Sequence, residues 1–146
     1  MSVSNTESIK KQKIKLDFKD SKYSTGRRKR SIAKVWIKKG SGNIHVNGLK
    51  MNEYFKRPVH QIIVTRPLEI TQVSSNYDVK CSVKGGGLSG QAGAIILGIS
   101  KALIAHDENL KKNLKKDKLT TRDSRVVERK KYGHRKARRS FQFSKR

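Results

Sequence analysis

The sequence predicts an α+β domain, in which helices cover one face of a sheet, followed by a long basic C-terminal tail. The stretch from Tyr77 to Val83 alternates apolar and polar residues, the pattern of a strand with one buried face. An apolar helix follows it, from about Gln91 to His106. The last eighteen residues contain nine Lys or Arg and no Asp or Glu. Because these cations repel one another, we expect that the tail cannot fold against itself and needs a dense polyanion, best met by nucleic acid.

Length and charge set the expected organisation. A chain of 146 residues favours one domain. We expect a flexible Lys-rich extension over residues 1–22, a compact α+β RNA-binding domain over 23–118 and an extended basic tail over 119–146. The formal net charge is +25, which strains a compact state by self-repulsion and is relieved by a polyanionic partner.

Composition argues against several other classes of function. Cys81 is the single cysteine, so neither a disulfide within the chain nor a multi-cysteine zinc site is possible, and we expect it to be buried and inert. Acids are few and dispersed, and the histidines lack ligand spacing. We therefore expect no metal, no cofactor, no catalytic residues and no small-molecule substrate. No apolar run approaches the roughly 18 residues of a membrane span, and residues 1–22 lack a secretory signal core, so we expect no membrane association. The histidines are His45, His60, His106 and His134.

A first strand is predicted over residues 33–38, where Ala33, Val35 and Ile37 alternate with polar residues and Trp36. Gly40-Ser41-Gly42 is a turn signal, and residues 43–46 alternate again before Asn47-Gly48. The two alternating segments predict a hairpin. Trp36 lies on the lysine-bearing face of its strand. Packing under an extension or a helix is favoured there over stacking on a base.

Helical segments follow. Residues 51–55 and 59–64 are predicted as short helical pieces separated by Pro58, although residues 62–64 fit a strand equally well, and Pro67 is expected to end the segment. The apolar stripe of the helix over 91–106 is broadened by Leu97 and Ile104, which predicts burial on more than one side. Residues 109–118 predict a cationic helix with little apolar face.

The glycine-rich loop from Gly85 to Gly90 joins the clearest strand to the apolar helix, and three interpretations stay open for it. Glycines and a helix N-terminus suit a nucleotide phosphate, but neither a P-loop lysine nor Rossmann spacing is present. The other two are a tight packing turn and a contact with an RNA backbone. We favour these two together over a nucleotide-dependent enzyme.

Two basic blocks are candidate phosphate sites. Gly26 to Ser31 is read as a loop that carries four successive cations, Arg27, Arg28, Lys29 and Arg30. The tail carries Arg122, Arg125, Arg129, Lys130, Lys131, Arg135, Lys136, Arg138 and Arg139 as candidate RNA-binding residues. Its interleaved acids are suited to orient neighbouring arginines. Tyr132, Phe141 and Phe143 are suited to stack on bases.

Four segments together resemble small ribosomal subunit protein nine in its bacterial and organellar form: residues 23–37, 40–48, 85–103 and 119–146. The glycine–glutamine helix start and the terminal Ser-Lys-Arg are specific when they occur together. The resemblance covers the chain from about Tyr23 onward and leaves residues 1–22 out.

The resemblance implies a two-layer sandwich related to the second domain of ribosomal protein five, with a left-handed βαβ crossover. It implies a structural role, with small-subunit ribosomal RNA and neighbouring proteins of the subunit head as partners. It also implies that Ser144, Lys145 and Arg146 approach the backbone of the peptidyl-site tRNA. The expected location is the small subunit of a ribosome in the bacterial cytoplasm or the mitochondrial matrix. The competing hypothesis is a small nucleotide-dependent enzyme or a free nucleic-acid chaperone.

Overall fold

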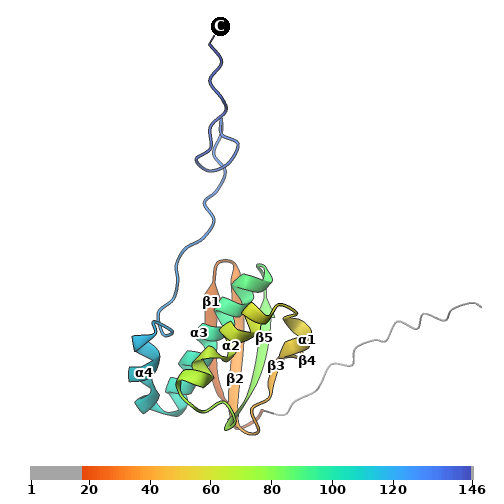
Figure 1. Ribbon diagram of the computed structural model, residues 1–146, viewed down its shortest axis with the longest axis vertical. Coiled ribbons are helices and arrows are strands. Elements are labelled where there is room, and N and C mark those ends of the chain that lie inside the picture. Colours follow the sequence, from red (N-terminus) through yellow and green to blue (C-terminus); the bar gives the residue numbers. More distant parts are fainter. Residues whose placement is uncertain (1–17, 146) are drawn as a thin grey trace, which may run out of the picture.

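The computed structural model describes residues 18–145, which form an α+β domain followed by an extended tail (Figure 1). The strands are β1 (Lys22–Arg28), β2 (Ser31–Lys39), β3 (Ile44–Val46), β4 (Leu49–Lys50) and β5 (Tyr77–Lys84). The helices are α1 (Met51–Tyr54), α2 (Pro58–Ile70), α3 (Leu88–His106) and α4 (Lys111–Lys116), with a short 3₁₀ turn η1 (Glu108–Leu110). One mixed sheet has the order β1-β2-β5-β3-β4. The predicted α+β class is confirmed.

The core lies between the sheet and the helices α2 and α3, which cover one face (Figure 1). Alternate residues of β2 and β5 point into it, as the sequence predicted: Ala33, Val35, Ile37, Val79, Cys81 and Val83 are all buried. α3 is buried on more than one side, because Leu97 is buried along with the predicted stripe.

α3 corrects one expectation from the sequence. Its 19 residues are long and apolar enough to cross a membrane by length and composition, although no run was expected to approach that length. Most of this helix is buried against the sheet and α2. The apolar composition is therefore accounted for by its place at the centre of the domain.

The predicted hairpin between residues 33–38 and 43–46 is wrong, because β5 lies between β2 and β3. β2 pairs antiparallel with β5 from Ile32 to Lys39, whereas β3 pairs parallel with its other edge. The turn at 40–43 carries the chain around the end of β5, where the Asp78 carboxylate accepts the backbone N–H groups of Ser41 and Asn43. Asn47 and Gly48 instead join β3 to β4, and both adopt the positive φ typical of a tight hairpin turn.

The basic block at residues 26–31 is not the predicted loop. Gly26, Arg27 and Arg28 belong to β1, which forms a hairpin with β2 through a turn at Lys29 and Arg30. The inward positions of β1 are occupied by Ser24, Gly26 and Arg28. Since none of them is apolar, the strand carries no alternation that a sequence pattern can register.

Helix boundaries differ from the prediction in three places. α2 continues through Pro67 to Ile70, so Pro67 does not end the segment. Pro67 has no N–H to donate to the Ile63 carbonyl, but its ring is fully buried in the core. α3 begins at Leu88, three residues before the predicted start. The predicted helix over 109–118 is split between η1 and α4, and Leu114 is its buried apolar contact.

Candidate nucleic-acid interface

The β1–β2 hairpin separates the four cations of the first basic block. Arg27 pairs with Ile32 and lies on the sheet face opposite the helices, whereas Arg28 lies on the helix side. Lys29 and Arg30 form the exposed tip, and Lys29 adopts a positive φ of 51°. The block therefore presents cations in three directions around one edge of the domain.

Arg28 joins the hairpin to the root of the tail. Its side chain lies across Gly93 of α3, where an added Cβ would overlap the Arg28 side chain. Its Nη2 then donates to Asp123 Oδ2 at 3.3 Å. Asp123 also accepts from the Arg125 side chain, at 2.8 Å from Nη2, and from the Arg125 backbone N–H at 3.0 Å. One carboxylate thus connects β1 with the first residues of the tail.

The charge of Asp123 is stabilised by these contacts. The hydrogen bond from the Arg125 side chain, the Arg125 backbone N–H and the nearby positive charges hold the pKa of Asp123 far below its ordinary range. The same carboxylate raises the pKa of Arg125. Because the folded-state pKa is depressed, the contribution of this contact is present above the unfolded pKa near 4 and is lost only as pH falls through the folded value. The contact is therefore expected to be unchanged between about pH 8 and pH 5.

Asp123→Asn is expected to loosen the root of the tail. The substitution removes the charge that Arg28 and Arg125 share, and exposed ion pairs have modest effects. We expect tryptic cleavage after Arg122 and Arg125 to become a few-fold faster at pH 8, with no change in the thermal midpoint of the domain.

Glu128→Gln is the matched control for this prediction. It removes the other acid of the tail, whose carboxylate pairs with Arg138 and Lys131 instead of with the domain. Cleavage after Arg122 should then stay at the wild-type rate. Equal acceleration by both variants would mean that Asp123 does not hold the tail to β1.

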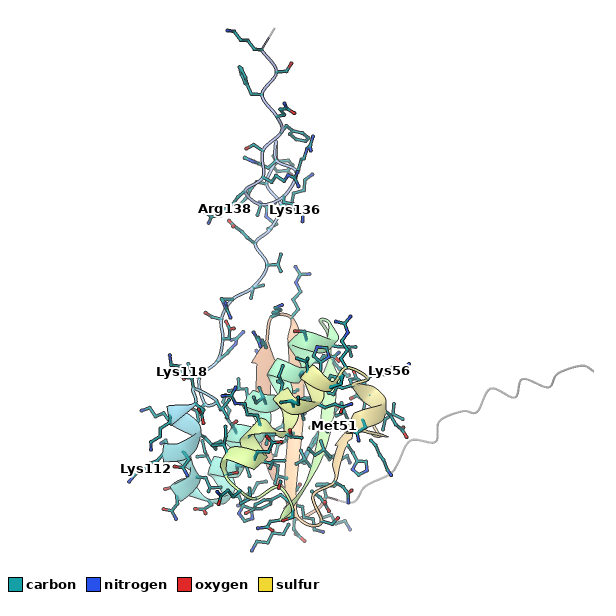
Figure 2. The ribbon with its side chains drawn as sticks, viewed as in Figure 1. Met51, Lys56, Lys112, Lys118, Lys136 and Arg138 are labelled. Carbon is teal, nitrogen blue, oxygen red and sulfur yellow. The ribbon has the colours of Figure 1, made fainter. Side chains whose placement is uncertain are left out.

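Beyond Asp123 the tail runs away from the domain without a helix or a paired strand, except for one small loop (Figure 1). In that loop Arg135 N–H donates to the Arg139 carbonyl at 2.7 Å, and His134 and Ser140 form an isolated antiparallel bridge. Figure 2 places Lys136 and Arg138 there, well away from the domain. The expectation that the tail cannot fold against itself is too strict, because Glu128 and Phe141 supply the partners that the cations lack.

Side-chain contacts hold residues of the tail together in this region. Arg138 Nε donates to Glu128 Oε2 at 2.9 Å, and the Arg135 guanidinium lies 5.3 Å from the centroid of the Phe141 ring. Tyr132 and Phe143 contact little of the protein, with 96% and 86% of their surface exposed. Large exposed aromatic rings beside arginines and lysines are the arrangement that suits stacking on nucleic-acid bases.

The structure thus arranges the sequence-predicted residues as two groups. Of the tail cations, Arg125, Lys131 and Arg138 pair with acids. All the predicted tail cations lie along one extended, exposed segment: Arg122, Arg125, Arg129, Lys130, Lys131, Arg135, Lys136, Arg138 and Arg139. The hairpin cations lie on the domain, where only Arg28 has a described contact with the tail. Ser144 and Lys145 are exposed at the far end of the tail, and Arg146 lies outside the described residues.

The glycine-rich loop is packed against the β1–β2 hairpin. Gly85 and Gly86 both have positive φ, and side chains there would meet the Arg30 carbonyl and the Ser31 hydroxyl. Ser31 Oγ donates to the Gly85 carbonyl at 3.0 Å, and so does Gln91 Nε2 at 3.2 Å. The need for glycine at both positions is accounted for by this turn and its neighbours.

Cys81 is buried in the core, and burial raises the pKa of its thiol, so it stays protonated at neutral pH. The inert role predicted for this cysteine agrees with its place. Within residues 18–145, no cluster of three histidine, cysteine or acidic side chains is positioned to hold a metal ion.

A second basic surface lies on the sheet face that the helices leave open, and the sequence indicated only the lysine-bearing face of the strand that carries Trp36. Lys34 and Lys84 lie there with Trp36. The alternation of Lys with Trp over residues 33–38 was the available signal, but a single strand does not show which faces of its neighbours join it.

Comparison with known protein families matches residues 26–146 to the family described as ribosomal protein S9/S16. The match begins within β1 and extends through the tail. The tail is therefore part of what the chain shares with the family, together with the domain.

Proposed function

Because the chain belongs to the ribosomal protein S9/S16 family, we propose that it is a structural protein of the small ribosomal subunit that binds ribosomal RNA in the subunit head. The observation that carries the proposal is the tail, an extended segment with exposed cations and aromatic rings that the family match includes. Such a segment gains little stabilisation from contacts with its own domain. Contacts with RNA phosphates stabilise it more, because they release counterions from the RNA.

Within this proposal the two basic groups have different roles. The hairpin cations Arg27, Arg28, Lys29 and Arg30 contact ribosomal RNA beside the domain, and the tail cations from Arg122 to Arg139 hold the tail in RNA. Ser144, Lys145 and Arg146 then reach the backbone of the peptidyl-site tRNA. Phosphate contacts position a protein without reading sequence, so the tRNA contact should be shared by all tRNAs.

The same proposal also covers the handedness of the fold, the neighbouring proteins and the location. The parallel pair β3–β5 and the helices between them form the unit in which we propose the left-handed crossover and the relation to the second domain of ribosomal protein five. Neighbouring proteins of the subunit head are further partners. The proposed location is a ribosome of the bacterial cytoplasm or the mitochondrial matrix.

We propose no catalytic activity and no cofactor. The support comes from the glycine-rich loop, whose positive-φ residues are required by the hairpin packed on it. The Gln91 carboxamide is engaged by Gly85 and by the Tyr54 hydroxyl at 2.7 Å. The enzyme and free-chaperone hypotheses are tested by sedimentation at moderate salt. Co-migration with small subunits supports the proposal, and recovery only in the soluble fraction refutes it.

The terminal residues are expected to tune tRNA affinity without holding the subunit together. Removing Ser144 to Arg146 should lower the affinity of purified small subunits for tRNA and reduce the salt slope by about 1 for each phosphate that the tail no longer neutralises. The effect should be nearly independent of tRNA sequence. The measurement is filter binding of several tRNAs across a salt series.

A matched pair of variants separates this role from general charge. Lys145→Gln with Arg146→Gln, and Lys130→Gln with Lys131→Gln, each remove two cations from the tail. Only the first pair should weaken tRNA binding, whereas the second pair should weaken incorporation into subunits. Unchanged tRNA affinity for the first pair would contradict the proposed contact.

A further inference from the structure

Within residues 18–145, one face of the sheet carries no helix. Strand alternation and register place Tyr23 and Arg27 of β1, Ile32, Lys34 and Trp36 of β2, Lys80, Ser82 and Lys84 of β5, and His45 of β3 on that face. It carries exposed apolar and aromatic side chains: Ile32 is 43% exposed and Tyr23 is 49% exposed. Large apolar side chains left on an open sheet face indicate a binding surface when they gather with polar groups around them.

Trp36 is held in place from two neighbouring strands. The Tyr23 ring lies 5.3 Å from it on β1, and Lys80 Nζ lies 5.9 Å from its centroid on β5. Lys80 also lies 5.7 Å from the Phe18 ring. The sequence favoured packing of Trp36 under an extension or a helix. The described contacts leave it half-buried, and residues 1–17 of the expected extension lie outside the described residues. These contacts place the indole between neighbouring side chains of β1 and β5.

A hollow of about 320 Å³ opens beside the indole, lined by Ile32, Lys34, Trp36, Ser82 and Lys84. Register explains its shape: Lys34 faces Ser82 across the strands, and Ile32 faces Lys84. Small Ser82 therefore forms the floor between longer neighbours. The hollow has apolar walls, one hydroxyl and two ammonium groups at its rim, and its volume is in the lower part of the range for small-ligand sites.

The charge on this face is one-sided. The strand positions that point to it carry six cations, Arg27, Lys34, Lys38, Lys50, Lys80 and Lys84, against the single acid Asp78. Asp78 accepts hydrogen bonds from the turn at Ser41 and Asn43, at one end of the sheet. Among the strand residues that the structure describes, an occupant of the hollow therefore meets positive charge on several sides and no carboxylate beside it.

We propose that this open face binds one unpaired nucleotide of RNA, with its base in the hollow against Trp36 and Ile32. The adjoining phosphates lie against Lys34 and Lys84. An unpaired nucleotide fits better than a duplex, because a base must leave its helix to reach an apolar hollow. It fits better than an acidic peptide, because a flat aromatic ring beside lysines suits base stacking. The inference rests on the proposed RNA-binding function and adds a site that neither the hairpin nor the tail provides.

Trp36 is the only tryptophan, so its fluorescence reports on this face directly. Full-length protein is titrated with a single-stranded oligoribonucleotide and with a duplex of the same length. We expect saturable quenching by the single strand and much less by the duplex. Lys34→Gln with Lys84→Gln should weaken the quenching about three- to tenfold and reduce its salt slope by about 1.4, at roughly 0.7 for each phosphate.

The control is Lys112→Gln with Lys115→Gln, which removes the same charge from α4. Its quenching curve should match that of the wild type. Equal quenching by duplex, or equal loss in both double variants, would overturn the proposal, because quenching would then follow net charge alone.

A second measurement addresses a protein neighbour as the occupant. In purified small subunits the access of acrylamide to Trp36 is measured before and after ribonuclease digestion. Protection that disappears with the RNA supports the proposal, and protection that survives complete digestion assigns the face to a protein and refutes it. Failure to co-sediment with subunits would contradict the proposed function instead, and the titration of the free protein would still decide the nucleotide site.

Discussion

Gly26→Ala is expected to destabilise the folded domain by about 3 kcal/mol, at the upper end of the usual range for overpacking. A Cβ on Gly26 would overlap the Ala94 carbonyl oxygen and lie 2.6 Å from the Gly98 backbone nitrogen. Both obstacles are backbone atoms of α3, so neither can turn aside as the end of a side chain can. β1 or α3 would have to move.

The contact between β1 and α3 explains why this shift is costly. Ser24 Oγ donates to the Gly98 carbonyl at 2.5 Å, two residues along the strand. Gly98 is itself closely packed, with its missing Cβ position 2.5 Å from Val35 Cγ2. Separating the strand from the helix would open the core at Val35 and would displace Arg28 from its place over Gly93. Urea unfolding followed by Trp36 fluorescence measures the loss, with an unchanged m-value.

Gly87→Ala is the matched control. It makes the same chemical change at a glycine with a negative φ, and nothing lies within 4 Å of the added Cβ. Its effect should stay below about 1 kcal/mol, from a poorer helix N-cap. If both variants unfold at the same urea concentration, the close β1–α3 approach does not limit stability.

The contact between β1 and α3 also explains why β1 was not predicted from the sequence. β5 and α3 were predicted because each buries a full face of apolar residues. β1 was missed because the space above it belongs to the α3 backbone, which leaves room for Gly26 and no apolar side chain. The missing apolar alternation in β1 therefore reflects the close approach of the strand to the α3 backbone.

The order of the strands in the sheet could not be predicted from the sequence for a different reason. Alternation over residues 33–38 and 43–46 reports which faces are buried, but it does not report which strand lies beside which. The order was decided by β5, which is far along the chain and pairs with β2 from Ile32 to Lys39. Local turn signals at Gly40 and Gly42 fit a hairpin and a turn around β5 equally well.

The candidate site likewise has one part that could be predicted from the sequence and one part that could not. The basic blocks could be read directly, since charge needs no fold to be recognised. The link from Arg28 to Asp123 and the gathering of Trp36 with Lys34 and Lys84 could not, because both depend on residues brought together across strands. A surface built from several strands or helices cannot be predicted from local sequence patterns alone, because its residues meet only in the folded domain.

Removal of residues 120–146 is expected to weaken binding to small-subunit RNA by several orders of magnitude at moderate salt while leaving the domain folded. Leu119 stays in place, where its N–H donates to the Leu114 carbonyl at 3.1 Å, and the core residues all precede it. The nine tail cations proposed to bind ribosomal RNA are removed together. If each neutralises one phosphate, the salt slope falls by up to about 8, and affinity near 200 mM salt falls by several orders of magnitude.

The measurement is filter binding of the RNA across a salt series, with circular dichroism to check folding. The control is a variant with Lys111, Lys112, Lys115 and Lys116 of α4 all replaced by glutamine. Four cations leave the folded domain in that variant, so binding driven by net charge would lower the slope by roughly 4. Binding through the tail predicts a change below about 1, because the α4 lysines would not face the RNA. If the salt slope falls in proportion to the charge removed in both variants, the tail is not a preferred contact for the RNA. The proposed division between tail cations that anchor in ribosomal RNA and terminal residues that reach tRNA would then also be wrong.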